Sequence, residues 1–570
     1  MASVENPPAR APSQLDSVVT LTQNAEPEQS PQSEAKKGKS RAFYLSFLAI
    51  MVTTFLSALD LTAVGTALPT IANALHDTKG EFTWVGSAYA LSSTGFIPLS
   101  GSLSDAFGRR PVVLISIGFF AVGSALAGAA QNMNMMIAAR TVQGIGGGGI
   151  LALSEILVAD LVPLAERGIY QGLLGLVWSF ASSIGPPIGG ALANRGNKAW
   201  RWLFYLNLPM TGISFVLVWF FLSVRQPEGS TRSKLAKVDW LGNAIVLAGS
   251  GLVIVGLAWG GIRFAWDSAE TLAPLIIGFA LLFVFAIYEA KVPKHPTVPF
   301  DIISNRTSLS GILATAVHGI VSISIIYYLP VFFQAGFGAT PIRSAVDFLP
   351  AALLTAPMAF VGGVVITVMK KYRPTNWAGW CLMIAGMGIL SLLREDSSTG
   401  LWVGVQIVAA LGMGILFAGP VFPILAPLPN HRTASALALF TFTRAFFQAW
   451  GITIASTVLQ NELKRKLPAA FVAQFPAGFE LAYVAIPVIR NLGRTGEAAD
   501  LALRKQVQHA FAMSMRTIWL VMTGIAGLGL LASFLMREIP MDTTVDERYA
   551  LKEDERKTVA DAEKQQSTSA

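Results

Sequence analysis

The feature that most constrains this chain is a succession of apolar segments, each long enough to cross a bilayer as a helix. Of the 570 residues, 53% are hydrophobic and only 13% are charged, whereas a soluble domain carries about 25% charged residues. About 20 apolar residues span the hydrocarbon core, and about 14 segments meet that length. The sequence therefore predicts an all-α polytopic membrane protein. The approximate limits of the expected spans are 43–68, 84–104, 111–130, 135–158, 168–192, 203–224, 240–260, 271–290, 309–334, 346–369, 376–393, 401–421, 434–459 and 514–536.

The distribution of basic residues predicts the orientation of the chain. Fourteen spans place both termini on one side, and the short loops there carry about 14 Lys and Arg, against about 7 in the short loops opposite. We therefore expect that side to be the cytoplasm. The loop 460–513 is an exception, because it is expected outside yet contains Lys464, Arg465 and Lys466. A fifteenth span at 481–489 would move the C-terminus outside, but so short a segment favours an interfacial position.

A sequence pattern that occurs twice suggests that the chain consists of two related halves. Residues 101–110 end the second span and residues 363–372 end the tenth, with a glycine first and basic residues near the end of both stretches. Parallel repeats about an axis along the membrane normal are a recurring transporter design. The expected regions are a disordered cytoplasmic tail (1–42), a six-helix bundle (43–224), two linker spans (225–308), a second six-helix bundle with the long extracellular loop (309–536) and a cytoplasmic tail (537–570).

Composition excludes several other classes of protein. The net charge is +8, but the basic residues lie in short loops between apolar spans. This distribution sets the orientation of a membrane protein and does not suit binding to a nucleic-acid backbone. A single cysteine, Cys381, cannot form an internal disulfide or a cysteine-based metal cluster. The glycine run at 146–149 lacks the preceding strand and the Lys-Ser/Thr of a nucleotide loop. We expect no enzyme activity, no metal and no cofactor.

Asp60 is the anomaly of the first span. It is a carboxylate inside an apolar run, where an ionised side chain costs at least ~2.5–3.5 kcal/mol. Such an acid must pair, titrate, or do both. Burial raises the pKa of a carboxyl, so the group can release a proton when water or a cation approaches. Two hypotheses remain open: proton coupling, or a structural Asp60 bonded near Thr62 or to another helix.

Five stretches in the first half resemble one family of transporters. In order and at the expected spacing, they match the major facilitator superfamily, specifically its 14-span drug:proton antiporter branch. The chain looks most like fungal members, many of which export toxins and other secondary metabolites. The resemblance covers 43–540 and implies the major facilitator fold, two six-helix bundles plus two extra central helices. The stretches are 59–69, 101–110, 140–146, 185–190 and 200–209.

The resemblance gives roles to particular residues. In the family, the arginine that matches Arg140 is associated with proton transfer, so Arg140 is the expected electrostatic neighbour of Asp60. Gln143 lies three residues on, on the same helical face. The alternative is an interfacial arginine that reaches toward the membrane surface.

Two further stretches are expected to act in gating. A latch would form at the cytoplasmic face where Asp105 is within reach of Arg109 or Arg110, with Gly101 and Gly108 allowing close approach and a tight turn. The alternative is that the arginines only fix topology. The family associates the fifth-span stretch with antiport, because its prolines kink the helix and its glycines allow tight contact. An ordinary membrane-helix kink is the alternative. The residues of that stretch are Gly185, Pro186, Gly189 and Gly190.

The second half contributes aromatic residues that suit an apolar cavity with few polar groups. Candidates for its lining are Tyr327, Gln334, Phe446 and Trp450. Elsewhere, Glu155 is a possible second membrane acid and His318 could titrate near neutral pH, although packing roles compete with both hypotheses. Asp160, beside a proline, is interpreted as a helix-end cap or as facing the cytoplasm.

These observations predict a proton-coupled efflux transporter for small hydrophobic or amphiphilic compounds, such as a toxin or a xenobiotic drug. An importer of a siderophore-like substrate is the first alternative, and a non-transporting membrane sensor is the second. The expected partners are the small-molecule substrate, protons and the bilayer, with no obligate protein partner. We expect a plasma-membrane location with both termini cytoplasmic; a vacuolar membrane is the alternative.

Overall fold

The computed structural model describes residues 39–76, 84–193, 195, 198–261, 263–475, 481–492 and 498–544. The described residues from Arg41 onward form one compact unit. Within the described residues the regular structure is helical and contains no β-strand, which confirms the all-α prediction. Of the tail 1–42, which the sequence predicts to be disordered, only residues 39–42 are described, and the C-terminal tail is described as far as residue 544.

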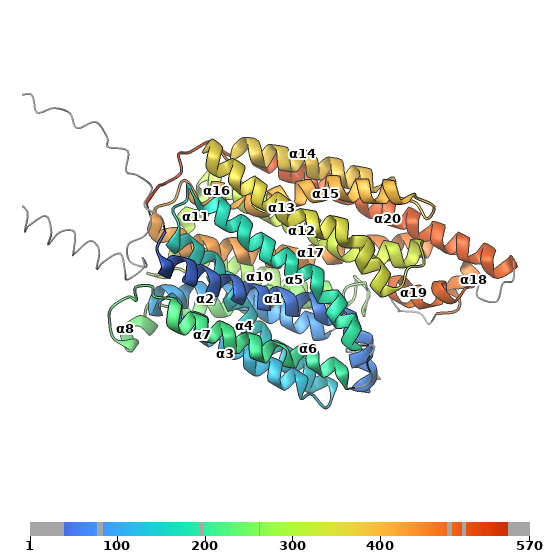
Figure 1. Cartoon of the computed structure of the whole chain (residues 1–570), viewed down its shortest axis with the longest axis horizontal. Helices are drawn as coiled ribbons and strands as arrows, with labels where there is room; N and C mark the ends of the chain where they lie inside the picture. The colour runs from blue at the N-terminus through green and yellow to red at the C-terminus, as the bar shows by residue number, and fades with distance from the viewer. Residues whose placement is uncertain are drawn as a thin grey trace, which may run out of the picture. The chain divides into compact units, whose positions relative to one another are not determined.

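The helices follow one another along the chain with short connections (Figure 1). They are α1 (Arg41–Ala74), α2 (Trp84–Phe107), α3 (Arg109–Gly128), α4 (Met133–Leu161), α5 (Arg167–Ala193), α6 (Trp202–Tyr205), α7 (Asn207–Phe221), α8 (Thr231–Leu235), α9 (Trp240–Trp259), α10 (Ala269–Lys291), α11 (Phe300–Ser304), α12 (Arg306–Gly336), α13 (Pro341–Met369), α14 (Arg373–Leu390), α15 (Thr399–Ala418), α16 (Val421–Leu425), α17 (Thr433–Lys466), α18 (Ala469–Val472), α19 (Leu481–Asn491) and α20 (Ala498–Ser533), with short 3₁₀ turns at Ala199–Arg201 and Asn430–Arg432.

Every expected span coincides with a helix, the sixth with α6 and α7 together. In the described part of the chain, 11 helical segments are long and apolar enough to cross a membrane. Helices α2, α5 and α14 are not among them, because glycine, proline and polar side chains lower their hydropathy. The chain is therefore a multi-pass membrane protein, and the count of 14 stays a prediction.

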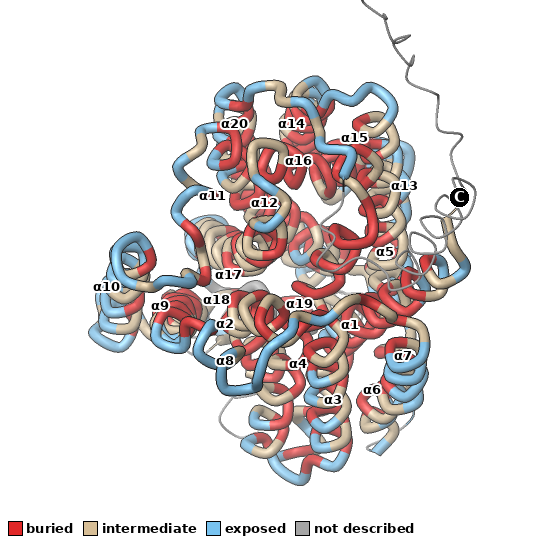
Figure 2. Tube along the Cα trace, turned by 90° about the vertical axis from the view of Figure 1, so that its left-hand side faces the viewer, coloured by how far each residue is buried: buried red, intermediate tan, exposed pale blue. Residues whose placement is uncertain are grey.

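Packing divides the long helices into two groups with two seams between them. In the first group, α1 packs on α5, and both α2 and α3 pack on α4. In the second group, α12 packs on α17 and α20, and α15 packs on α13 and α14. One seam joins α5 to α13 and the other joins α17 to α2 and α4 (Figure 2). Helices α9 and α10 form a pair of their own, and α9 contacts α2 and α17.

The segment after α20 crosses the ends of several helices. The backbone N–H of Arg537 donates to Thr307 Oγ1 at 3.2 Å, and that of Ile539 donates to the Tyr372 hydroxyl at 3.1 Å. Burial raises the pKa of Tyr372 to about 12. Further on, the Ala165 N–H donates to the carbonyl of Asp542 at 3.1 Å. This segment thereby bonds to the first turn of α12 and to residues that immediately precede α5 and α14.

The expected extracellular loop is more helical than the sequence indicates. Helix α17 continues to Lys466 and α20 already begins at Ala498, so much of 460–513 belongs to the two long helices. Hydropathy detects only the apolar part of a helix, and these helices extend into polar sequence. Helix α19 has 11 residues, too few to span a bilayer.

Candidate functional site

Asp60 and Arg140 meet inside the unit. Asp60 lies in α1, Arg140 lies in α4, and the Arg140 Nη1 donates to Asp60 Oδ2 at 2.6 Å. The side chains are 0% and 1% exposed, respectively. Arg140 therefore does not reach toward the membrane surface. Thr62, considered as a structural partner of Asp60, instead donates to the backbone carbonyls of Ala58 and Leu59.

Neutral donors complete the surroundings of the carboxylate. Gln143 Nε2 donates to Asp60 Oδ1 at 2.9 Å, and Asn207 Nδ2 donates to the same oxygen at 2.7 Å. Both amides also contact the Ser124 hydroxyl, at 2.9 and 3.3 Å. Helices α1, α3, α4 and α7 each contribute a side chain, so the network ties four elements to one charge.

The guanidinium of Arg140 is equally enclosed. Its Nε donates to the Val85 carbonyl at 3.0 Å, and its Nη1 also donates to Gln143 Oε1 at 2.6 Å. Its central carbon lies 4.4 Å from the ring centroid of Tyr89, within the range of a cation–π interaction. The pair is thus a buried ion pair with satisfied hydrogen bonds. Removing one partner of such a pair leaves an uncompensated buried charge.

This geometry ties the packing of α1 against α4 to the charge of the Asp60 carboxylate. Arg140 stays charged in the same buried place. Loss of the charge on Asp60 would therefore leave the guanidinium without its counter-charge.

The fifth-span stretch packs against α1 close to Asp60. A Cβ placed on Gly185 would lie 2.2 Å from Thr62 Oγ1, so this crossing requires a glycine. Helix α5 continues through Pro186, with Gly189 buried. A Cβ on Gly190 would lie 3.7 Å from Ile342 of α13. The stretch therefore contacts α1 on one side and approaches α13 on the other.

A second ionic cluster lies at the ends of α2, α3 and α4. Arg109 donates through Nη1 to Asp105 Oδ1 at 2.6 Å and through Nε to Asp160 Oδ2 at 2.8 Å. Arg109 is 1% exposed and Asp160 is 4% exposed. Gly108 has φ 93°, which favours glycine at the turn between α2 and α3. The interpretation of Asp160 as a cap or a cytoplasm-facing residue was wrong, because the fold carries Arg109 onto it.

Arg110 and Gly101 lie apart from that cluster. Arg110 donates to the Trp219 carbonyl, and its guanidinium carbon lies 5.2 Å from the Trp219 ring centroid. A Cβ on Gly101 would lie 2.7 Å from Ala438 Cβ of α17. The same stretch therefore contacts both α7 and the second group of helices.

The aromatic candidates do not converge on one place. Tyr327 is 46% exposed and Gln334 is half-buried. Phe446 is buried in a cluster with residues of α9, and the ring centroid of Trp450 lies 5.8 Å from that of Phe279 in α10. Because α9 and α10 cover this part of α17, sequence alone could not assign its neighbours. A cavity-lining role for these four residues stays a prediction.

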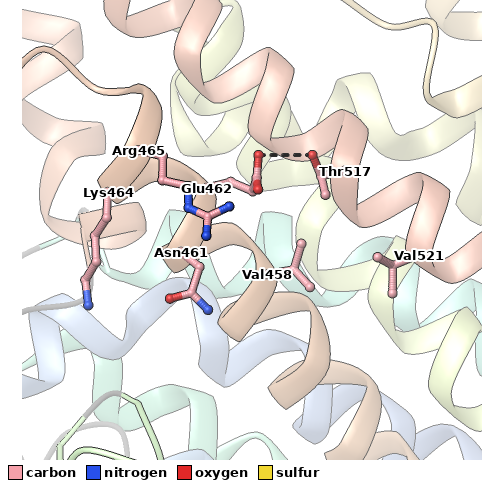
Figure 3. A pocket seen from close by; sticks show the side chains of 7 residues that line it. All are labelled: Val458, Asn461, Glu462, Lys464, Arg465, Thr517 and Val521. Carbon is pink, nitrogen blue, oxygen red and sulfur yellow. Dashed lines mark hydrogen bonds between the residues drawn. The ribbon is translucent and has the colours of Figure 1, made fainter.

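A pocket of about 520 Å³ lies between α17 and α20 and contains none of the predicted site residues (Figure 3). Glu462 crosses it to accept a hydrogen bond from Thr517 and also pairs with Lys466 at 2.7 Å. Its lining is Val458, Asn461, Glu462, Lys464, Arg465, Thr517 and Val521.

Sequence reasoning missed a charged residue of the thirteenth span. Arg444 of α17 donates to the Phe417 carbonyl at 2.6 Å, and its guanidinium carbon lies 4.4 Å from the ring centroids of Phe417 and Phe440. Glu155, whose carboxylate accepts from Gln171, is electrostatically coupled to it across α4 and α17. The available signal was the one that identified Asp60, a lone charge in an apolar span. His318 contacts the Met413 carbonyl at 3.1 Å.

Comparisons with known proteins place this architecture in a family. The sequence matches the Major Facilitator Superfamily over residues 50–452. It is 37% identical over 530 residues to "Efflux pump FUS6" of Gibberella moniliformis (strain M3125 / FGSC 7600), covering 92% of each chain. It is 36% identical over 548 residues to "MFS-type efflux pump LUC4" of Fusarium sp, covering 94% of each. The chain is a member of the major facilitator superfamily of membrane transporters.

A solved structure supports the fold. The human organic anion transporter MFSD10 (TETRAN) superposes with a TM-score of 0.54 at 16% identity, covering 87% of this chain and 99% of that one. At this identity the likeness concerns the fold alone. It agrees with the major facilitator fold expected from the sequence.

Proposed function

We propose that this protein is a proton-coupled efflux transporter that exports small hydrophobic or amphiphilic compounds. A secondary-metabolite toxin or a xenobiotic drug is the proposed cargo. The observation that carries the proposal is the buried Asp60–Arg140 ion pair, held by Gln143 and Asn207. The printed names of the fungal relatives, which call them efflux pumps, support the direction of transport.

In the proposed cycle, Asp60 carries the proton. Its ionised form pairs with Arg140, and its protonated form releases the guanidinium and favours a second arrangement of the helices. A proton moving down a potential of 100 mV supplies about 2.3 kcal/mol, and each pH unit about 1.4 kcal/mol. Gly185 places α5 against α1 two residues from Asp60, so movement of α1 reaches the α5–α13 seam.

The Arg109 cluster is the proposed gate. It joins the ends of α2, α3 and α4 through two carboxylates, and it would be closed in one conformation and broken in the other. We place this end at the cytoplasm, with both termini on that side, in a plasma membrane. Gly101 and the fifth-span residues Pro186, Gly189 and Gly190 serve the contacts between the two groups of helices in this proposal.

Transport in vesicles tests the proposal. Full-length protein in liposomes is given an imposed pH gradient and a panel of toxins and dyes. Accumulation should require the gradient and should fall to background in Asp60→Asn. The matched control is Asp301→Asn, the same chemical change in an exposed carboxylate that pairs with Arg432 at 3.0 Å. Accumulation that survives collapse of the gradient, or full activity in Asp60→Asn, contradicts proton coupling, and net uptake into cells would favour the importer.

A further inference from the structure

A second pair of acids lies on the two helices that stand outside both groups. Asp239 precedes the first residue of α9 and Glu289 lies near the last residue of α10. Asp239 is 8% exposed and Glu289 is 7% exposed. Neither belongs to the Asp60 network or to the Arg109 cluster, so the proposed transport cycle does not use them.

Each carboxyl group has one oxygen with donors and one without. Asp239 Oδ1 accepts from the Gly242 N–H at 2.9 Å and from the Tyr288 hydroxyl at 3.0 Å. Glu289 Oε2 accepts from the Val298 N–H at 3.4 Å. The other two oxygens, Asp239 Oδ2 and Glu289 Oε1, are buried and have no hydrogen-bond partner among the described residues.

The two oxygens without donors lie close to the same point in the structure. A Cβ placed on Gly242 would lie 2.0 Å from Asp239 Oδ2 and 2.8 Å from Glu289 Oε1, so both oxygens border one small space. The two carboxyl groups are within hydrogen-bonding reach of each other. Ionised carboxylates only accept hydrogen bonds, so two of them in this position leave both oxygens unsatisfied.

The charges around the pair also indicate that the two carboxyl groups are not both ionised. In the part of the chain that the structure describes, no basic side chain forms a salt bridge with either acid, and Lys237, Lys291, Lys294 and His295 nearby are exposed. Tyr288 is the other titratable group that contacts the pair. Two buried carboxylates side by side, without a counter-charge, do not both ionise.

We propose that Asp239 and Glu289 share one proton, which makes the α9–α10 pair a second buried proton site of this transporter. The proton lies between Asp239 Oδ2 and Glu289 Oε1 and gives both oxygens a hydrogen bond. At its removal both groups become carboxylates and repel each other across the α9–α10 contact.

The pair is connected to the gating stretch of α2 through Thr297. Asn243 Nδ2 donates to Thr297 Oγ1 at 2.8 Å, and the Ser102 hydroxyl donates to the same oxygen at 3.4 Å. Ser102 follows Gly101, and the N–H of Val298, the residue after Thr297, donates to Glu289 Oε2 at 3.4 Å. Separation of the carboxylates therefore moves the acceptor to which α2 is bound.

Infrared spectroscopy of the full-length protein in lipid tests the site directly. The wild type should show the carbonyl stretch of one protonated carboxyl group at neutral pH that disappears in Glu289→Gln and in the double variant Asp239→Asn/Glu289→Gln. It should persist in Glu270→Gln, the same change in an exposed acid at the other end of α10. It should also persist in Asp60→Asn, which separates this site from the proposed transport site.

A thermal measurement keeps the inference testable if the infrared bands overlap. Because the folded protein holds the proton, the melting temperature of the wild type should fall from neutral to alkaline pH, and Glu289→Gln should remove this dependence. An unchanged carboxyl band in Glu289→Gln overturns the proposal. A bound cation is the alternative to the shared proton, because Asn243 Oδ1 is a third buried oxygen without a donor and three oxygens suit a hard cation. The proposal is therefore also overturned if Na⁺, Mg²⁺ or Ca²⁺ raises the melting temperature of the wild type but not that of Glu289→Gln.

Discussion

The Asp60 site and the Asp239–Glu289 pair bury carboxylates by opposite means. Asp60 is balanced by the full charge of Arg140 and by two amide donors. Asp239 and Glu289 face each other with no cation between them among the described side chains. In the proposed scheme, a proton that arrives at Asp60 leaves Arg140 without its counter-charge, whereas a proton that leaves the Asp239–Glu289 pair leaves two carboxylates next to each other. On this proposal, the two buried acidic sites respond to protons in opposite directions.

The largest expected effect is the loss of the counter-charge at the first site. Arg140→Leu leaves Asp60 buried without a partner, which should cost about 3–5 kcal/mol of stability and abolish gradient-driven transport. Thermal unfolding in lipid and vesicle uptake measure the two effects. Arg432→Leu is the control, because its exposed pair with Asp301 should be worth at most about 1 kcal/mol. Equal losses of stability in Arg140→Leu and Arg432→Leu would show that burial does not make the Asp60–Arg140 pair more important for stability than an exposed pair.

Replacing an acid by its amide should separate the two sites most sharply. Asp60→Asn leaves the Arg140 charge uncompensated, so we expect a loss of about 3–5 kcal/mol. Glu289→Gln supplies an N–H where the shared proton lay, so its loss should stay below about 1 kcal/mol. Thermal unfolding at neutral pH compares the two. If Glu289→Gln were as damaging as Asp60→Asn, the shared proton would be the wrong description of the pair.

The gate should depend more on its buried carboxylate than on its exposed one. Asp160→Asn should cost about 2–4 kcal/mol, since Arg109 is buried and loses a charged partner. Asp105→Asn should cost about 1 kcal/mol or less, because the Asp105 side chain is 36% exposed. Unfolding and cysteine accessibility on the proposed cytoplasmic side are the measurements. A reversed order would show that Asp160 only packs.

Crowding at the α1–α5 crossing should produce a moderate effect. Gly185→Ala places a methyl group against Thr62 Oγ1, and overpacking of this kind costs about 1–3 kcal/mol. Transport should fall with it, because α5 must move past α1. The double variant Gly185→Ala/Thr62→Ala removes the clashing hydroxyl and should recover part of both losses. Absence of any recovery would place the defect elsewhere.

The smallest effect concerns the exposed segment after α20. Hydrogen bonds from the Thr544 N–H and from the side chains of Thr544 and Asn430 lower the pKa of Asp542. A lowered pKa means that the ionised form is favoured in the folded protein, so these contacts persist above about pH 4 and weaken as the pH falls through the lowered value. Hydrogen exchange of residues 537–544, corrected for its intrinsic pH dependence, should then increase. Asp542→Asn should remove most of that pH dependence.

The sequence by itself predicted the membrane architecture, singled out Asp60 and Arg140 as charges inside apolar spans, and predicted the Asp105–Arg109 contact. Each of these depends on a local quantity: the length of an apolar run, a charge inside such a run, or two charges four residues apart. The family resemblance added the expectation that Asp60 and Arg140 meet, although 80 residues separate them.

Only the tertiary structure decided which helix faces are in contact. It placed Asn207 and Ser124 on Asp60, carried Asp160 to Arg109, and covered Phe446 with α9. It also brought Asp239 and Glu289 together, although each stands at the end of an apolar span where water would be the default partner. Hydropathy reports that a segment is buried in a membrane, but not which neighbour each face meets. Whether a buried acid such as Asp60 or Asp239 has a counter-charge depends on that neighbour.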